Sequence, residues 1–131
     1  MQPTVQTGIG EIKAAFASHT VDVDPDGEGG AFVRVNDLPF DETSPTTSGW
    51  VAFRLTFAYP HADIYPHYLP SGLLRRDGTP LGDPFRHKEM KLGRFTGPSI
   101  ELSRRSKDWN PGRDTAAIKL AKILDFIRTR P

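Results

Sequence analysis

The residues whose types could do chemistry gather in one segment of thirteen residues, 99–111. It reads Ser-Ile-Glu-Leu-Ser-Arg-Arg-Ser-Lys-Asp-Trp-Asn-Pro, with three serine hydroxyls, two adjacent arginines and acidic side chains. As purely structural residues, Trp109 would fix the segment to the core and Pro111 would set the chain direction before a helix. That interpretation leaves Glu101 and the cluster 103–106 unexplained.

Residue types and motifs that the sequence lacks exclude several kinds of catalytic and metal site. None of the 131 residues is cysteine, which excludes disulfides, a thiolate nucleophile, cysteine-bound zinc and iron–sulfur clusters. The four histidines form no His-x-His or His-Glu-x-x-His pattern, so no metal site is predicted. The glycine-rich phosphate loops and the Gly-x-Ser-x-Gly elbow of serine hydrolases are absent. The sequence therefore predicts neither a metal nor an organic cofactor.

Charge is distributed unevenly along the chain. Residues 1–65 hold three basic and nine acidic residues, whereas 66–131 hold fourteen basic and seven acidic ones. This asymmetry indicates a face for an anionic partner, although basic side chains that merely solvate the surface would give the same counts. A nucleic-acid-binding module is the less favoured alternative, because the basic stretch contains only Phe85 and Phe95 for base stacking.

Hydrophobic spacing predicts the elements that precede the segment. Residues 7–18 are expected to form an amphipathic helix, since Ile9, Ile12 and Phe16 fall at i, i+3 and i+7. Alternating apolar residues between turn residues predict a four-stranded antiparallel meander over 20–69.

The second half of the chain is expected to be mostly irregular until its last helix. Residues 70–113 are predicted as an irregular loop region, with 70–98 dense in glycine and proline and a candidate for ordering on partner binding. Residues 114–130 are predicted as a helix whose apolar stripe is Leu120, Ile123, Leu124 and Ile127. The fold class is α+β, in a single domain over 1–131. No membrane span or signal peptide is recognised, so a cytoplasmic protein is expected.

The order of these elements and motifs resembles the ubiquitin-conjugating enzyme (UBC-like) superfamily, in particular its divergent prokaryotic branch. Its members have an N-terminal helix, a four-stranded meander, a proline turn, an active-site loop, a Trp-x-Pro sequence and a helix. In this chain the proline turn is similar to Tyr59-Pro60 through Pro66, and the Trp-x-Pro sequence to Trp109-Asn110-Pro111. The resemblance implies a ubiquitin-like protein and its activating enzyme as partners.

The resemblance also shows what is missing. The family's cysteine lies eight residues before this tryptophan, between isoleucine and leucine, where the chain has Glu101 between Ile100 and Leu102. The usual His-Pro-Asn tripeptide upstream is absent as well. Thioester transfer is therefore impossible, and two roles remain. The chain would be either a non-catalytic scaffold for a ubiquitin-like protein or a transferase that carries the modifier on a serine.

Ser103 is the serine that the transferase hypothesis favours, because it lies two residues after Glu101. A serine hydroxyl needs a positioned base, and an oxyester on Ser103 would need one within about 3 Å. Arg104 or Arg105 could polarise the acyl carbonyl. An ordinary loop hydroxyl is the simpler interpretation of Ser103. The candidate bases are His67, His87, Glu101 and Asp108.

Overall fold

The computed structural model of the chain describes residues 1–41, 43 and 46–129. Along the described chain, one helix comes first, six strands follow, and a second helix comes last. The elements are α1 (Pro3–Ala15), β1 (Val21–Pro25), β2 (Ala31–Pro39), β3 (Ser48–Leu55), β4 (His67–Pro70), β5 (Phe85–Leu92), β6 (Phe95–Leu102) and α2 (Ala116–Arg128). No helix among these residues is both long and apolar enough to cross a bilayer.

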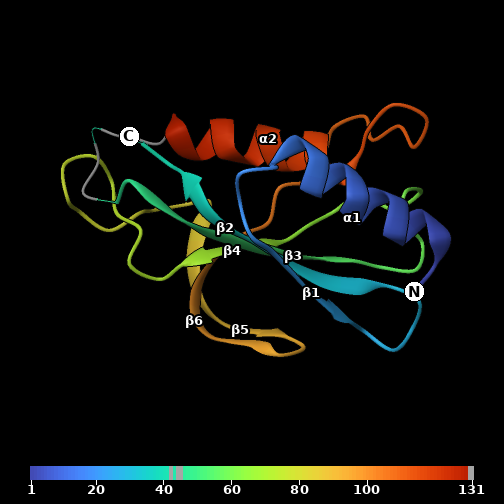
Figure 1. Ribbon diagram of the computed structural model, residues 1–131. Coiled ribbons are helices and arrows are strands. Elements are labelled where there is room, and N and C mark those ends of the chain that lie inside the picture. Colours follow the sequence, from blue (N-terminus) through green and yellow to red (C-terminus); the bar gives the residue numbers. More distant parts are fainter. Residues whose placement is uncertain (42, 44–45, 130–131) are drawn as a thin grey trace.

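The six strands form one antiparallel sheet in the order β1-β2-β3-β4-β6-β5. Both helices lie on one side of the sheet, while the β5–β6 hairpin curves away on the other (Figure 1). The two helices also contact each other. The protein is therefore α+β, with a helical layer over one face of the sheet.

The main core lies between the sheet and the two helices. Alternate residues of the central strands β2 and β3 point toward the helices, as the period of two in a strand requires. Those of β2 and β3 meet apolar side chains from the stripes of α1 and α2, and all are buried: Val33, Val35, Phe53, Leu55, Ile9, Ile12, Leu120, Ile123 and Ile127.

A second, smaller core lies on the opposite face of the sheet, where the β5–β6 hairpin folds back. Met90, Leu92 and Phe95 of the hairpin are buried in one cluster with Ala52 and Tyr68. The hairpin tip is fixed to β1 by a hydrogen bond of 3.0 Å from the backbone N–H of Arg94 to Asp24. The hairpin therefore covers apolar surface that the helices leave exposed.

The sheet has six strands instead of the four expected, and the prediction of an irregular region over 70–113 is wrong. The four strands expected within 20–69 are present, but 85–92 and 95–102 add two more. β5 escaped prediction because it is an edge strand whose residues 86–89 are all exposed, so it carries little apolar alternation. Glycine and proline inside β6 also masked that strand.

The helices differ from their predicted bounds by a few residues. α1 spans Pro3–Ala15 instead of 7–18, since Pro3 occupies a first-turn position where proline is favoured. α2 spans Ala116–Arg128 instead of 114–130, and the hydroxyl of its N-cap Thr115 accepts a hydrogen bond from the backbone N–H of Ile118.

Candidate functional site

The loop between β6 and α2, residues 103–115, is fastened to the proline turn at 59–66. The indole Nε1 of Trp109 donates a hydrogen bond of 2.7 Å to the carbonyl oxygen of Pro60. The phenol oxygen of Tyr59 accepts one of 3.0 Å from the backbone N–H of Ala116, at the start of α2. The Tyr59-Pro60 and Tyr65-Pro66 peptide bonds are both cis. The two short motifs that the sequence singled out are thus in direct contact.

A buried lysine holds the first half of this loop. Lys119 of α2 is only 4% exposed, and its Nζ donates to the Arg104 carbonyl and to the Ser106 hydroxyl, each at 2.7 Å. Its third acceptor is the Asp63 carboxylate at 3.2 Å. Asp63 also accepts hydrogen bonds of 2.6 Å from the backbone N–H groups of Ser106 and Ile64. Every proton of the ammonium group therefore has a partner, as a buried charge requires.

The two charges stabilise each other in this buried network. Burial raises the pKa of Asp63, but the backbone N–H groups and Lys119 outweigh it, so the pKa of this carboxyl lies below its usual range. Burial lowers the pKa of Lys119, and the Asp63 carboxylate opposes that shift. Charged Lys119 is therefore a structural cation, which is held by its acceptors and is not a free base.

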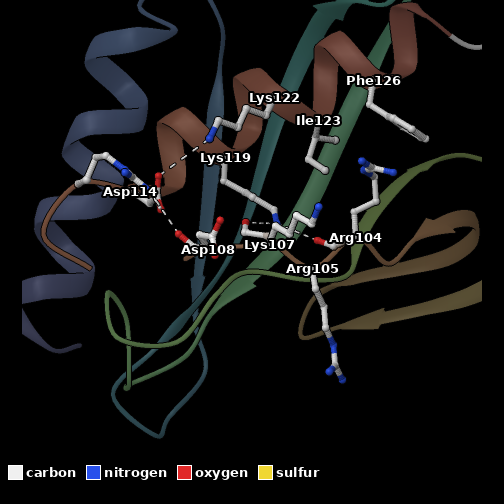
Figure 2. A pocket seen from close by; sticks show the side chains of 11 residues that line it. Arg104, Arg105, Lys107, Asp108, Asp114, Lys119, Lys122, Ile123 and Phe126 are labelled. Atoms are coloured by element: carbon white, nitrogen blue, oxygen red, sulfur yellow. Dashed lines mark hydrogen bonds and ion pairs between the residues drawn. The ribbon is translucent and has the colours of Figure 1, made fainter. Parts of the chain in front are cut away.

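A cleft of about 470 Å³ opens between this loop and α2. Figure 2 shows Lys119, Lys122 and Phe126 entering it from α2, while Arg104, Lys107 and Asp108 come from the loop. Its lining contains six basic side chains and only two acidic ones, which are Asp108 and Asp114. Such a concentration of one sign of charge attracts anions.

Ser103 lies at the edge of this region without the base that its predicted role needs. It is exposed, and its hydroxyl forms no hydrogen bond with any residue in the described part of the chain. None of the four predicted bases bonds to it. The predicted activation of Ser103 therefore has no counterpart in the structure.

Glu101 lies on the other face of the sheet from the helices. The residue is 6% exposed, and its carboxylate pairs with Arg86 at 2.7 Å and with Lys88 at 3.1 Å. Burial raises the pKa of Glu101, but these two cations outweigh it and the pKa is lowered. The Glu101 carboxylate therefore links β6 to β5 through two ion pairs and takes no part in the cleft.

Neither of the two predicted histidines forms a hydrogen bond with Ser103. His67 is completely buried beside the ring of Phe53, and neither of its ring nitrogens has a hydrogen-bond partner among the residues that the structure describes. Burial lowers its pKa to about 3, and nearby Lys119 adds to the shift. His87 is exposed on the edge strand β5, opposite Ile100.

Of the seven candidate residues named from the sequence, only Arg104, Arg105 and Asp108 line the cleft, and the side chain of Arg105 turns away from it (Figure 2). The residues that sequence reasoning missed are Asp63, Ser106, Lys119 and Lys122. Lysine side chains usually lie on the surface of a helix, but Lys119 is buried. It lies three residues after Ala116 and four before Ile123, and this spacing already places it on the buried face. No signal in the sequence linked Asp63 to it.

Comparison with known protein families, with curated proteins and with solved structures finds no match for this chain. Within the described residues, no group of three or more histidine or acidic side chains could hold a metal ion. The function must therefore be argued from the site itself.

Proposed function

We propose that the protein is a UBC-like component of a bacterial ubiquitin-like modification pathway, in which it binds a ubiquitin-like protein or its activating enzyme as a non-catalytic scaffold. The hydrogen bond from Trp109 to Pro60 carries this proposal. It joins the Trp-x-Pro sequence to the proline turn, the two motifs on which the resemblance to that superfamily depends. The N-terminal helix, the antiparallel strands β1–β4 and the last helix also follow in the expected order.

Binding is favoured over transfer by the state of the residues nearest the family's cysteine position. Glu101 is held by two cations in the outer face of the sheet, and Ser103 bonds to no base in the described part of the chain. A serine hydroxyl without a base is a poor nucleophile near neutral pH. A scaffold needs neither group, since it holds its partner through surface contacts alone.

Ser106 supports a second candidate, a carrier of the modifier as an oxyester. Its Oγ lies 2.7 Å from Lys119 Nζ and donates to Asp63 Oδ1 at 3.2 Å. In such a step Ser106 Oγ would attack the carbonyl carbon of the thioester on the activating enzyme. The proton would pass to Asp63, and the enzyme's thiolate would leave. The lowered pKa of Asp63 makes it a weak base, so this candidate ranks second.

One experiment separates these functions. The protein is incubated with ATP, a ubiquitin-like protein and the activating enzyme of its own organism, then analysed by size-exclusion chromatography and intact mass. We expect a complex without a covalent adduct. An adduct that hydroxylamine cleaves and that Ser106→Ala abolishes would establish the carrier instead, with Ser103→Ala as the matched control. Absence of both complex and adduct would contradict both functions.

A further inference from the structure

The cleft between the 103–115 loop and α2 carries positive charge that the molecule itself does not neutralise. Lys119 is paired with Asp63 at its floor. Arg113 and Lys122 share one carboxylate, Asp114, at 3.7 Å and 4.0 Å. The remaining cations, Arg104, Arg105 and Lys107, have no acidic partner among the described residues. The charges of Arg104 and Lys107 therefore lie on one concave surface without an acidic partner in the described chain, where they reinforce one another.

The two arginines of the loop are held in place by aromatic rings. The guanidinium of Arg104 stacks over Phe126 at 3.8 Å from the ring centre, and that of Arg105 stacks over Tyr65 at 4.9 Å. Stacking occupies the face of a guanidinium and leaves the N–H groups at its edge free to donate. In Figure 2 Arg104 lies on the side of Phe126, whereas Arg105 is directed away from the cleft. Arg104 is therefore oriented in advance for an anion in the cleft.

The walls of the cleft are firmly held. Lys119 binds the Arg104 carbonyl and the Ser106 hydroxyl, so the loop is tied to α2 at the cleft floor. Trp109 ties the far end of the same loop to Pro60. A surface that is ordered before binding loses less conformational entropy when a partner docks.

We propose that this cleft is the docking site for an acidic segment of a partner polypeptide. Carboxylate side chains match the donor groups of Arg104, Lys107 and Lys122, and a volume of about 470 Å³ admits a short stretch of chain. The inference goes beyond the proposed function, because it names the binding surface and the chemistry of its ligand. It does not require that the protein belong to the UBC-like superfamily.

An acidic polypeptide suits the cleft better than a nucleic acid does. Bound single strands need open aromatic faces for their bases. Here the chain's own arginines already cover the rings of Phe126 and Tyr65. Asp108 and Asp114 in the lining would also repel a continuous run of phosphates, whereas separate carboxylates can be placed between them.

Fluorescence anisotropy with a labelled hexaglutamate peptide tests the proposal, with a hexaglutamine peptide and an oligothymidylate as matched probes. The variant is Lys107→Gln/Lys122→Gln, since both side chains are exposed and neither supports the core. Its control is Lys13→Gln/Lys91→Gln, which removes the same charge from α1 and β5. Two partly screened charge contacts predict that the cleft variant weakens binding of hexaglutamate by about 5- to 30-fold.

The outcomes are distinct. Preferential binding of hexaglutamate, with that loss in the cleft variant and a change of less than about twofold in the control, supports the proposal. Equal affinity for hexaglutamine, or equal weakening by both variants, would overturn it. If oligothymidylate binds and hexaglutamate does not, the proposal is overturned in favour of a nucleic-acid site. None of these results depends on a ubiquitin-like protein, so the proposed function can fail while this inference stands.

Discussion

Lys119 is buried, yet it holds one wall of the cleft in place. It lies on the buried face of α2, yet its ammonium group reaches the Asp63 carboxylate and the backbone of the 103–115 loop. An ammonium in that position is tolerated because three acceptors replace its water. The loop segment that forms one wall of the cleft is therefore held to α2 at Arg104 and Ser106.

Replacing Lys119 by methionine keeps the length of the side chain and removes the charge. Asp63 would then be a buried carboxylate without its cation, so we expect Lys119→Met to lower the free energy of unfolding by about 3–5 kcal/mol. Urea denaturation measures this loss. The control is Lys122→Met on the exposed face of the same helix, which should change stability by no more than about 0.5 kcal/mol. A loss below about 1 kcal/mol in Lys119→Met would show that the ion pair does not anchor the loop.

His67 makes stability depend on pH. Its pKa falls from 6.5 in the unfolded chain to about 3 in the folded one, chiefly through burial, with Lys119 lowering it further and Asp63 opposing. The unfolded chain therefore binds one more proton between these values. The contribution of His67 to stability is complete above pH 6.5 and falls by about 1.4 kcal/mol for each unit down to about 3.

His67→Leu should remove this part of the pH dependence. Comparing urea unfolding at pH 7 and pH 5, we expect the wild type to lose about 2 kcal/mol more than the variant. At pH 7 the variant should be at least as stable, because two buried nitrogens without partners disappear. The matched control is His87→Leu on the exposed edge strand, which should retain the wild-type slope. Identical slopes in all three proteins would contradict the buried, neutral state of His67.

At the scale of elements, periodic apolar residues explain what could be predicted from the sequence. The strands over 20–69 and both helices were identified because one of their faces enters the core at a regular spacing. β5 offered no such pattern, since its residues 86–89 are exposed at the edge of the sheet. The site was harder still, because Asp63 and Lys119 meet only after the proline turn and α2 have packed together.

The packing of α1 against that turn can be tested with two glycines of one helix. A Cβ on Gly8 would lie 2.6 Å from the Tyr59 ring, whereas a Cβ on Gly10 would meet nothing within 4 Å. We expect Gly8→Ala to lower the free energy of unfolding by about 1–3 kcal/mol through overpacking. Gly10→Ala should raise it by about 0.5–1 kcal/mol, because alanine restricts the unfolded chain. Thermal unfolding compares them, and similar effects of both changes would refute this contact.

At the scale of the whole molecule, the uneven charge of the sequence becomes a division between elements. The acidic half of the chain builds α1 and β1–β3, whereas the basic half builds the β5–β6 hairpin, the 103–115 loop and α2. The two halves nearly cancel to a net charge of +1. The molecule therefore attracts an acidic partner through a local surplus near the cleft, not through its total charge.

This division predicts separate effects on the rates of association and dissociation with hexaglutamate. Long-range attraction acts on association and is screened beyond about 8–10 Å at physiological salt, whereas direct contacts control dissociation. In stopped-flow measurements, Lys13→Gln/Lys91→Gln should slow association slightly and leave dissociation unchanged. Lys107→Gln/Lys122→Gln should also accelerate dissociation several-fold at both low and high salt. Both variants lose the same total charge. Equal dissociation rates for the two would therefore mean that the cleft attracts hexaglutamate only at long range and makes no direct contact with it.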